Sequence, residues 1–193
     1  MGRLADTRLP ATFTFAEAES YGVSRRALQH LQDTGAVERI GRGLYRRTDE
    51  EPADHDLIEI AAKAHRPTLC LLSALARHEL TDIIPVAHDV ALPRGVWQPA
   101  VSAPVHWHKF DAETFDVGRT EIPLDSTYAI GLYDAPRSII DAFRLRRAVG
   151  PDVPNEALRR WLRRGGKPAD LMRLTTNFPA ARPVLLHTLQ VLL

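Results

Sequence analysis

The sequence has few of the residues that mark secreted, membrane or zinc-binding proteins. It contains a single cysteine, Cys70, so an intramolecular disulfide is excluded and no CxxC pair is present to bind zinc. No apolar run approaches the roughly 20 residues that a membrane-spanning helix needs, and residues 1–10 lack the hydrophobic core of a signal peptide. These absences predict a soluble, cytoplasmic protein without contact to a membrane.

The chain also lacks a large net charge, and lysine is scarce. The 25 cationic residues, of which 22 are Arg, are balanced by 24 Asp and Glu, which leaves +1 at pH 7. This balance argues against a protein that coats nucleic acid through bulk charge. The cations are unevenly placed, however, because residues 20–48 carry a local net charge of +4 and residues 137–173 carry +6. Both segments are rich in the side chain that forms forked contacts with phosphate and guanine.

The overall composition, with 45% hydrophobic and 25% charged residues, is that of a globular protein. An acidic stretch around Pro52 separates a short basic segment from a longer one of different character. We therefore predict two domains, residues 1–49 and residues 56–193.

The second domain is predicted to have an α+β fold with a mostly antiparallel sheet. Helical spacing or apolar, Ala- and Leu-rich composition indicates helices at residues 56–64, 68–78, 137–147, 155–164, 169–178 and 183–193. Short runs rich in β-branched and aromatic residues, separated by Pro and Gly, indicate strands at residues 90–92, 105–110, 115–124 and 128–133.

The first domain reads as a winged helix-turn-helix. Thr14 and Glu17 have the spacing of a capping box, Gly22 turns the chain, and Ser24 can cap a second helix with Leu28 and Leu31 facing inward. Two short strands follow, at residues 36–40 and 44–47, joined by a Gly-Arg-Gly tip at residues 41–43. Glycines that adopt positive φ would let this wing approach a phosphate backbone closely.

The exposed residues of this motif are hydrogen-bond donors suited to DNA. Arg and Gln form paired contacts with guanine and adenine edges, and the major groove admits a helix in B-form DNA but not in A-form RNA. The predicted recognition-helix residues are Ser24 as the cap and Arg25, Arg26, Gln29 and His30 as readers. The predicted wing contacts are Arg39, Arg42, Arg46 and Arg47. The alternative is a winged helix used only for protein contact, as in an interaction adaptor.

Two stretches of the chain resemble the AbiEi family of antitoxins, which belong to type IV toxin–antitoxin and phage-abortive-infection systems. The first is Gly-Val-Ser-Arg-Arg-Ala-Leu at 22–28, continuing to Ile-Gly-Arg-Gly-Leu-Tyr at 40–45; the second is Tyr-Asp-Ala-Pro-Arg-Ser-Ile-Ile-Asp-Ala-Phe at 133–143. The resemblance implies a winged helix that represses its own operon by binding repeated half-sites on double-stranded DNA upstream of the promoter. It also implies a C-terminal antitoxin domain and a nucleotidyltransferase-like toxin, opposed without a stable complex.

One departure from the family pattern lies at the start of the chain. The family usually has a full helix before the helix-turn-helix, but here only Met1 to Arg8 is available before Pro10. We therefore expect a short or absent first helix.

The C-terminal helices carry a second concentration of arginine. Leu158, Trp161 and Leu162 fall on one face of the helix at 155–164. A second basic surface for DNA, or for the RNA substrate of the toxin, is predicted from the arginines on the opposite face and on the preceding helix: Arg144, Arg147, Arg159, Arg160, Arg163 and Arg164. The alternative is an ordinary solvated helix face. Arg137 and Asp141 are expected to form a helix-surface ion pair or a helix-start contact.

Enzymatic chemistry is the runner-up interpretation. Asp116, Glu121 and Asp125 loosely resemble the carboxylates of a metal-dependent nuclease, which a winged helix would target, but the Glu-x-Lys strand of such enzymes is missing. His106 and His108 have the spacing of a metal pair without an evident third ligand. We therefore predict no metal, no cofactor and no catalysis.

Two apolar features complete the prediction. Cys70, inside an apolar helix, is expected to be a buried small hydrophobe. The segment at 183–193 either docks into the C-terminal core or forms a self-association face.

Overall fold

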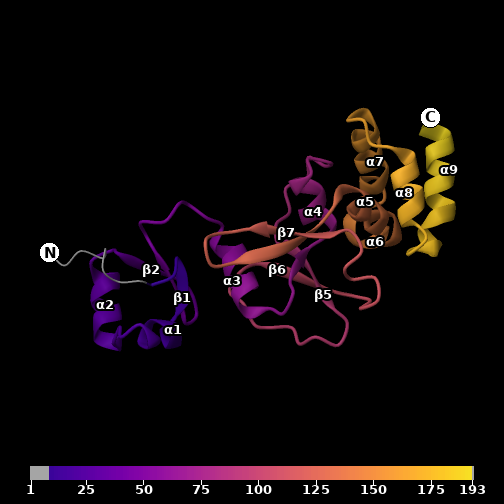
Figure 1. The fold of residues 1–193 in the computed structure, drawn as a ribbon. Coiled ribbons are helices and arrows are strands. Elements are labelled where there is room, and N and C mark those ends of the chain that lie inside the picture. Colours follow the sequence, from indigo (N-terminus) through magenta and orange to yellow (C-terminus); the bar gives the residue numbers. More distant parts are fainter. Residues whose placement is uncertain (1–8, 193) are drawn as a thin grey trace. The chain divides into compact units, whose positions relative to one another are not determined.

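The computed structural model describes residues 9–192 and divides into two compact units (Figure 1). The first unit holds the chain up to His65 together with two later segments, Pro99–Pro104 and Ile122–Ile130. The second unit holds the remainder. The predicted domains, 1–49 and 56–193, stay a prediction, and the two compact units divide the chain differently.

The first unit contains a three-stranded antiparallel sheet, in the order β1-β3-β2, and three helices. In chain order its elements are β1 (Thr12–Thr14), α1 (Phe15–Ser20), α2 (Arg25–Asp33), β2 (Val37–Gly41), β3 (Leu44–Arg47) and α3 (His55–Lys63). This is the predicted winged helix-turn-helix with one additional strand, β1, which the sequence patterns did not indicate. The predicted short or absent first helix falls on residues 1–8 and lies outside the described residues.

Local side-chain chemistry fixes the helix-turn-helix. The Thr14 hydroxyl accepts a hydrogen bond from the Glu17 N–H, and the Glu17 carboxylate accepts one from the Thr14 N–H at 2.6 Å, which completes the capping box. Gly22 turns the chain with a φ of +81°. The hydrophobic sides of α1 and α2 then meet β1 and β2 in a core built from Phe13, Ala18, Val23, Leu28 and Val37.

The second unit is built on a five-stranded sheet and a group of helices. Its elements are β4 (Thr68–Leu69), α4 (Leu71–Arg77), β5 (His88–Pro93), β6 (Val105–Phe110), β7 (Arg119–Pro123), β8 (Ala129–Tyr133), α5 (Ala135–Arg144), α6 (Arg146–Val149), α7 (Val153–Arg163), α8 (Pro168–Leu174), η2 (Pro179–Ala181) and α9 (Arg182–Leu192). The tip of the β7–β8 hairpin, residues 122–130, is grouped with the first unit. Within residues 9–192, none of the helices combines the length and apolar character required to span a bilayer.

The α+β class is confirmed, but the sheet is mixed rather than mostly antiparallel. The strand order is β6-β5-β4-β8-β7, and both the β4–β8 and the β5–β6 pairs are parallel. The short central strand β4 pairs antiparallel with β5. The expected helix at 68–78 begins only at Leu71, because Thr68 and Leu69 belong to this strand. Cys70 is therefore the residue before α4, and its side chain is fully buried.

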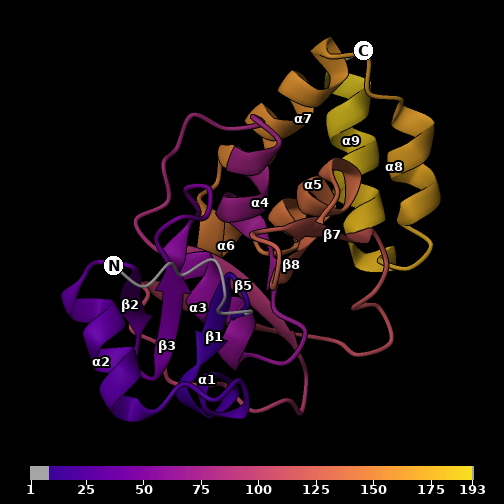
Figure 2. The same ribbon diagram turned by 60° about the vertical axis from the view of Figure 1, so that its left-hand side comes forward.

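Helix α5 is the central helix of the second unit and packs against α4, α7, α8 and α9 (Figure 2). Its Arg137 is completely buried, together with Asp141, whose carboxylate lies 2.7 Å from the Arg137 Nε. The same guanidinium donates to the carbonyl oxygens of Thr114 and Val117 and lies over the Tyr133 ring. The expectation of a helix-surface ion pair is thus wrong, because this pair forms part of the core.

Helix α9 docks into the core of the second unit, which is one of the two predicted alternatives for this segment. Leu185 and Leu189 are buried there, whereas Val184, Leu186 and Val191 remain exposed. Self-association of this face remains a prediction.

Candidate nucleic-acid interface

Helix α2 presents a face of hydrogen-bond donors on the first unit. The Ser24 hydroxyl accepts from the Ala27 N–H at 3.2 Å and so caps the helix. Because Leu28 is buried and Leu31 packs against the core, the opposite face of the helix is left to solvent. The predicted readers all lie on that exposed face: Arg25, Arg26, Gln29 and His30.

These four side chains differ in how they are held. The Arg25 guanidinium lies 5.0 Å from the centroid of the Phe15 ring, a cation–π contact that restricts its motion. The Gln29 amide donates to the Asp33 carboxylate at 2.9 Å. The Arg26 side chain makes no hydrogen bond or ion pair with any residue in the described part of the chain. Of the two arginines on this helix, Arg26 therefore has the fewer side-chain contacts within the described residues.

The wing carries Arg42 at its exposed tip. Gly43 has a φ of +72°, as the predicted approach to a backbone requires, but Gly41 has no positive φ and serves another purpose. A Cβ atom on Gly41 would lie 3.0 Å from the Glu59 carboxylate, so glycine here permits close packing of β2 against α3. The exposed Arg39 donates from its Nε to the Gly41 carbonyl oxygen at 3.1 Å, which ties its side chain to the tip of the wing.

Arg46 does not belong to this surface. It is 3% exposed, and its guanidinium donates to the Glu51 carbonyl oxygen, while its Nε is buried with no partner in the described chain. The prediction that Arg46 contacts DNA is therefore wrong, because its side chain is buried. A signal was present in the sequence, because Leu44 and Arg46 stand two residues apart on a strand and therefore share its inward face.

Arg47 is partly exposed and already bound within the first unit. Its guanidinium lies 2.6 Å from the Asp49 carboxylate and 3.6 Å from that of Glu50, and it donates to the Leu9 carbonyl oxygen. The hydrogen bond to Asp49 is the largest contribution that raises the pKa of Arg47. A phosphate would compete with these carboxylates for the same guanidinium.

The second basic surface is divided by ion pairs within the second unit. Arg144 contacts Asp141 at 2.6 Å, Arg160 pairs with Asp82 and Glu156, and Arg164 contacts Glu79 at 2.9 Å. The remaining three predicted residues are exposed and form no ion pair with any described residue: Arg147, Arg159 and Arg163. The cationic surface that can meet a phosphate is thus smaller than the sequence suggests.

The three carboxylates considered for a nuclease do not converge. Asp116 pairs with Arg66, and Glu121 lies 3.0 Å from Arg119; both acids are exposed on the second unit. Asp125 belongs to the first unit, where it accepts a hydrogen bond from the Thr12 hydroxyl at 2.6 Å. Each acid therefore has a separate partner, and no shared metal position joins them.

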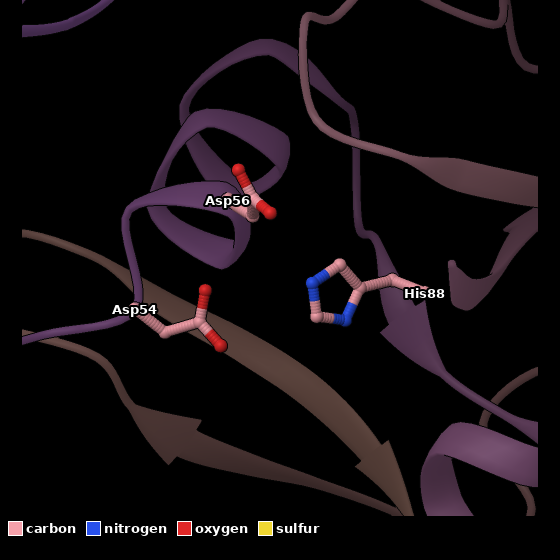
Figure 3. A group of neighbouring side chains, drawn as sticks. All are labelled: Asp54, Asp56 and His88. Carbon is pink, nitrogen blue, oxygen red and sulfur yellow. The ribbon is translucent and has the colours of Figure 1, made fainter. Parts of the chain in front are cut away.

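Two further acids lie at the beginning of α3 (Figure 3). Asp54 caps this helix by accepting from the Leu57 N–H at 3.1 Å, and Asp56 follows in the first turn. His88, drawn in the same figure, begins β5 in the second unit. Because the three residues belong to different units, we assign no site to them.

Comparisons with known proteins agree with this geometry. Residues 8–48 match a family profile described as "Transcriptional regulator, AbiEi antitoxin". The resemblance to the AbiEi family is thereby confirmed over residues 8–48. The AbiEi match covers the helix-turn-helix and the wing, and it supports a regulatory DNA-binding role for this segment. None of the curated proteins matches the chain.

A solved structure with a similar fold spans most of the chain. The crystal structure of the RV2827C protein from Mycobacterium tuberculosis superposes with a TM-score of 0.56 at 16% sequence identity. The similarity covers 86% of this chain and 67% of that one. At this identity the comparison establishes the fold, and it extends beyond the segment matched by the AbiEi profile.

Proposed function

We propose that this protein is a sequence-specific DNA-binding regulator that represses its own operon. The observation that carries the proposal is the exposed donor face of α2, which lies in a winged helix matched by the AbiEi profile. Exposed Arg and Gln at the beginning of a recognition helix are the groups that read base edges in the major groove.

The internal contacts assign different roles to the donors. Arg26 and His30 have no side-chain hydrogen bonds within the described residues, so we assign them to base edges. Arg25, held by the Phe15 ring, and Gln29, held by Asp33, are placed for contacts that need a fixed direction. Arg39 and Arg42 contact the phosphate backbone through the wing, and Arg47 does so only if it leaves Asp49.

The antitoxin part of the proposal concerns the second unit. We infer that the protein belongs to a type IV toxin–antitoxin system and counteracts a nucleotidyltransferase-like toxin without a stable complex. The similarity of residues 133–143 to the family supports this inference. Arg147, Arg159 and Arg163 then form a second phosphate-binding surface, for DNA or for the toxin's RNA substrate.

A gel-shift titration against the protein's own upstream DNA tests the proposal. Specific binding at moderate salt is expected, with competitor DNA of unrelated sequence failing to displace it. Arg26→Ala should cost about 1–3 kcal/mol of binding free energy and relax sequence preference. Arg42→Ala should weaken all sequences alike and reduce the slope of log K against log salt by about one unit.

Arg173→Ala is the matched control, because Arg173 is a highly exposed cation on the second unit. It should leave the affinity for the upstream DNA unchanged. Equal effects of Arg26→Ala and Arg42→Ala on specificity would contradict the assigned roles, and an absence of specific binding would refute the regulator itself.

A further inference from the structure

A pocket in the second unit is bordered by the junction of α5 with α6 and by η2 with the first turn of α9. Its volume is about 340 Å³, within the roughly 300–1,000 Å³ of small-molecule sites. Arg144 and Arg146 supply its charged side chains, and the rest of the lining is apolar, including Phe143, Leu145 and Val184. No acidic residue lines this pocket. Its chemistry is therefore that of a cationic mouth beside an apolar wall.

Arg144 retains positive charge although it forms an ion pair. Its Nη1 lies 2.6 Å from the Asp141 Oδ1, but the other oxygen of that carboxylate lies 2.7 Å from the Arg137 Nε. Among the described residues no second acid pairs with either guanidinium, so one negative charge faces two positive ones. Arg137 and Asp141 are completely buried, whereas the Arg144 side chain is 33% exposed. The excess charge of this cluster therefore meets solvent at Arg144.

The two arginines of the pocket differ in how they are held. The Arg144 guanidinium is fixed by Asp141 and lies 4.7 Å from the centroid of the Phe178 ring. Arg146 begins α6 and is exposed, and its side chain forms no hydrogen bond or ion pair with any residue from 9 to 192. One guanidinium is thus oriented in advance, and the other is free to move onto an anion beside it.

We propose that this pocket binds a nucleotide, with its phosphate between the guanidinium groups of Arg144 and Arg146. The planar fork of arginine matches the oxygens of a phosphate group. The apolar wall of the pocket contacts the base, and this wall favours a nucleotide over inorganic phosphate, which would leave it uncovered. The site lies wholly within the second unit and does not depend on DNA binding by α2, which the gel shift measures separately.

A free mononucleotide and the 5′-phosphorylated end of an oligonucleotide offer the same chemistry. Isothermal titration calorimetry of the full-length protein with AMP tests for the site, and one AMP per chain is expected. Adenosine, which lacks the phosphate, and inorganic phosphate, which lacks the base, should each bind at least about 10-fold more weakly. A 5′-phosphorylated trinucleotide that binds as tightly as AMP identifies a nucleic-acid end as a ligand, and weaker binding identifies the free nucleotide.

Substitutions at exposed positions separate binding from folding. Arg146→Ala should lower AMP affinity by at least about 10-fold without changing the far-ultraviolet circular dichroism. Ala180 is an exposed residue of the pocket lining. Ala180→Glu places a negative charge beside the phosphate, so it should bind AMP at least about 10-fold more weakly than Ala180→Gln, which has the same size without the charge.

Arg159→Ala is the matched control, because Arg159 is an exposed cation on α7 that does not line the pocket. It should retain the wild-type affinity for AMP. The proposal is overturned if the wild type fails to bind AMP, or if Arg146→Ala and Ala180→Glu bind AMP as tightly as the wild type. Loss of binding in Arg159→Ala overturns it as well, because the nucleotide would then occupy the basic surface of α7.

Discussion

At the scale of single residues, the surroundings of each arginine decide what it can do. Arg26 is exposed and makes no side-chain hydrogen bond or ion pair with the described residues, whereas Arg46 is buried on β3. Arg137 is buried in the second unit against Asp141 and three aromatic rings. Only the first type is available to a nucleic acid. Removing one partner of a buried pair leaves an uncompensated charge, so Arg137 serves stability.

Glu59 provides the pH-dependent test at this scale. Burial raises the pKa of its carboxyl, but the hydrogen bond from Lys63 and those from the Ala103 and Ser102 N–H groups outweigh burial and leave the pKa below its usual 4.5. A lowered pKa means that Glu59 stabilises the fold at pH values above 4.5. This contribution is lost as the pH falls through the lowered, folded-state pKa.

Glu59→Gln should therefore lower the free energy of unfolding by about 1–3 kcal/mol near neutral pH. The difference from the wild type should shrink on acidification below the usual glutamate pKa, because the wild type loses the same interaction. Urea denaturation at neutral and acidic pH measures this. Glu19→Gln, at an exposed position on α1, should change neither value, and a difference for Glu59→Gln that is constant with pH would contradict the assignment.

Which residues could be predicted depends on the range of the interactions that place them. The capping box of Thr14 and Glu17 and the Ser24 cap involve neighbours three residues apart, so the sequence pattern sufficed. The carboxylate that His108 contacts at 2.7 Å belongs to Asp89, which lies on the neighbouring strand β5. The position of Asp89 depends on the parallel pairing of β5 with β6, which no local sequence pattern specifies. The burial of Arg46 follows from the alternation of side chains along a strand, but a charged residue is usually expected to be exposed.

At the scale of elements, the cap of α2 joins helix stability to the proposed recognition face. Ser24 satisfies the Ala27 N–H in the first turn, which is the turn that carries Arg25 and Arg26. Loosening this turn would increase the conformational freedom that the readers lose on binding. The cap should therefore affect both folding and DNA affinity, although Ser24 needs no contact with a base.

Ser24→Ala should lower the stability of the first unit by about 1 kcal/mol, the usual cost of losing an N-cap. Ser24→Asn should restore it, because the asparagine side chain accepts the same hydrogen bond. Thermal denaturation and the gel shift measure the two effects. Ser20→Ala at the end of α1 is the control, since its hydroxyl donates only to the Glu17 carbonyl oxygen within its own helix. Full stability of Ser24→Ala would show that the cap contributes nothing.

At the scale of the whole molecule, the first unit is assembled from distant parts of the chain. Segment 99–104 joins the unit through hydrogen bonds from the Ser102 and Ala103 N–H groups to the Glu59 carboxylate. Segment 122–130 joins it through the hydrogen bond from the Thr12 hydroxyl to Asp125. The mixed sheet of the second unit also joins segments that are distant in the sequence, because β4 pairs with β5 on one side and with β8 on the other. A winged helix ending near residue 49 would lack these contacts, and a module that small buries little core.

The bond between Thr12 and Asp125 tests this composite unit. The Thr12 side chain is fully buried, and its hydroxyl donates to an Asp125 oxygen at 2.6 Å across 113 residues of sequence. Thr12→Val keeps the shape but removes the donor, so it should cost about 1–3 kcal/mol of stability by leaving the carboxylate oxygen unsatisfied. Thr34→Val, at an exposed threonine that bonds only to its own helix, should have a smaller effect.

A fragment of residues 1–49 should unfold at lower urea concentration than the first unit of the intact chain, because it lacks Asp125 and Glu59 together. An equal midpoint for fragment and intact chain would mean that the winged helix is self-sufficient and that the distant segments only rest against it.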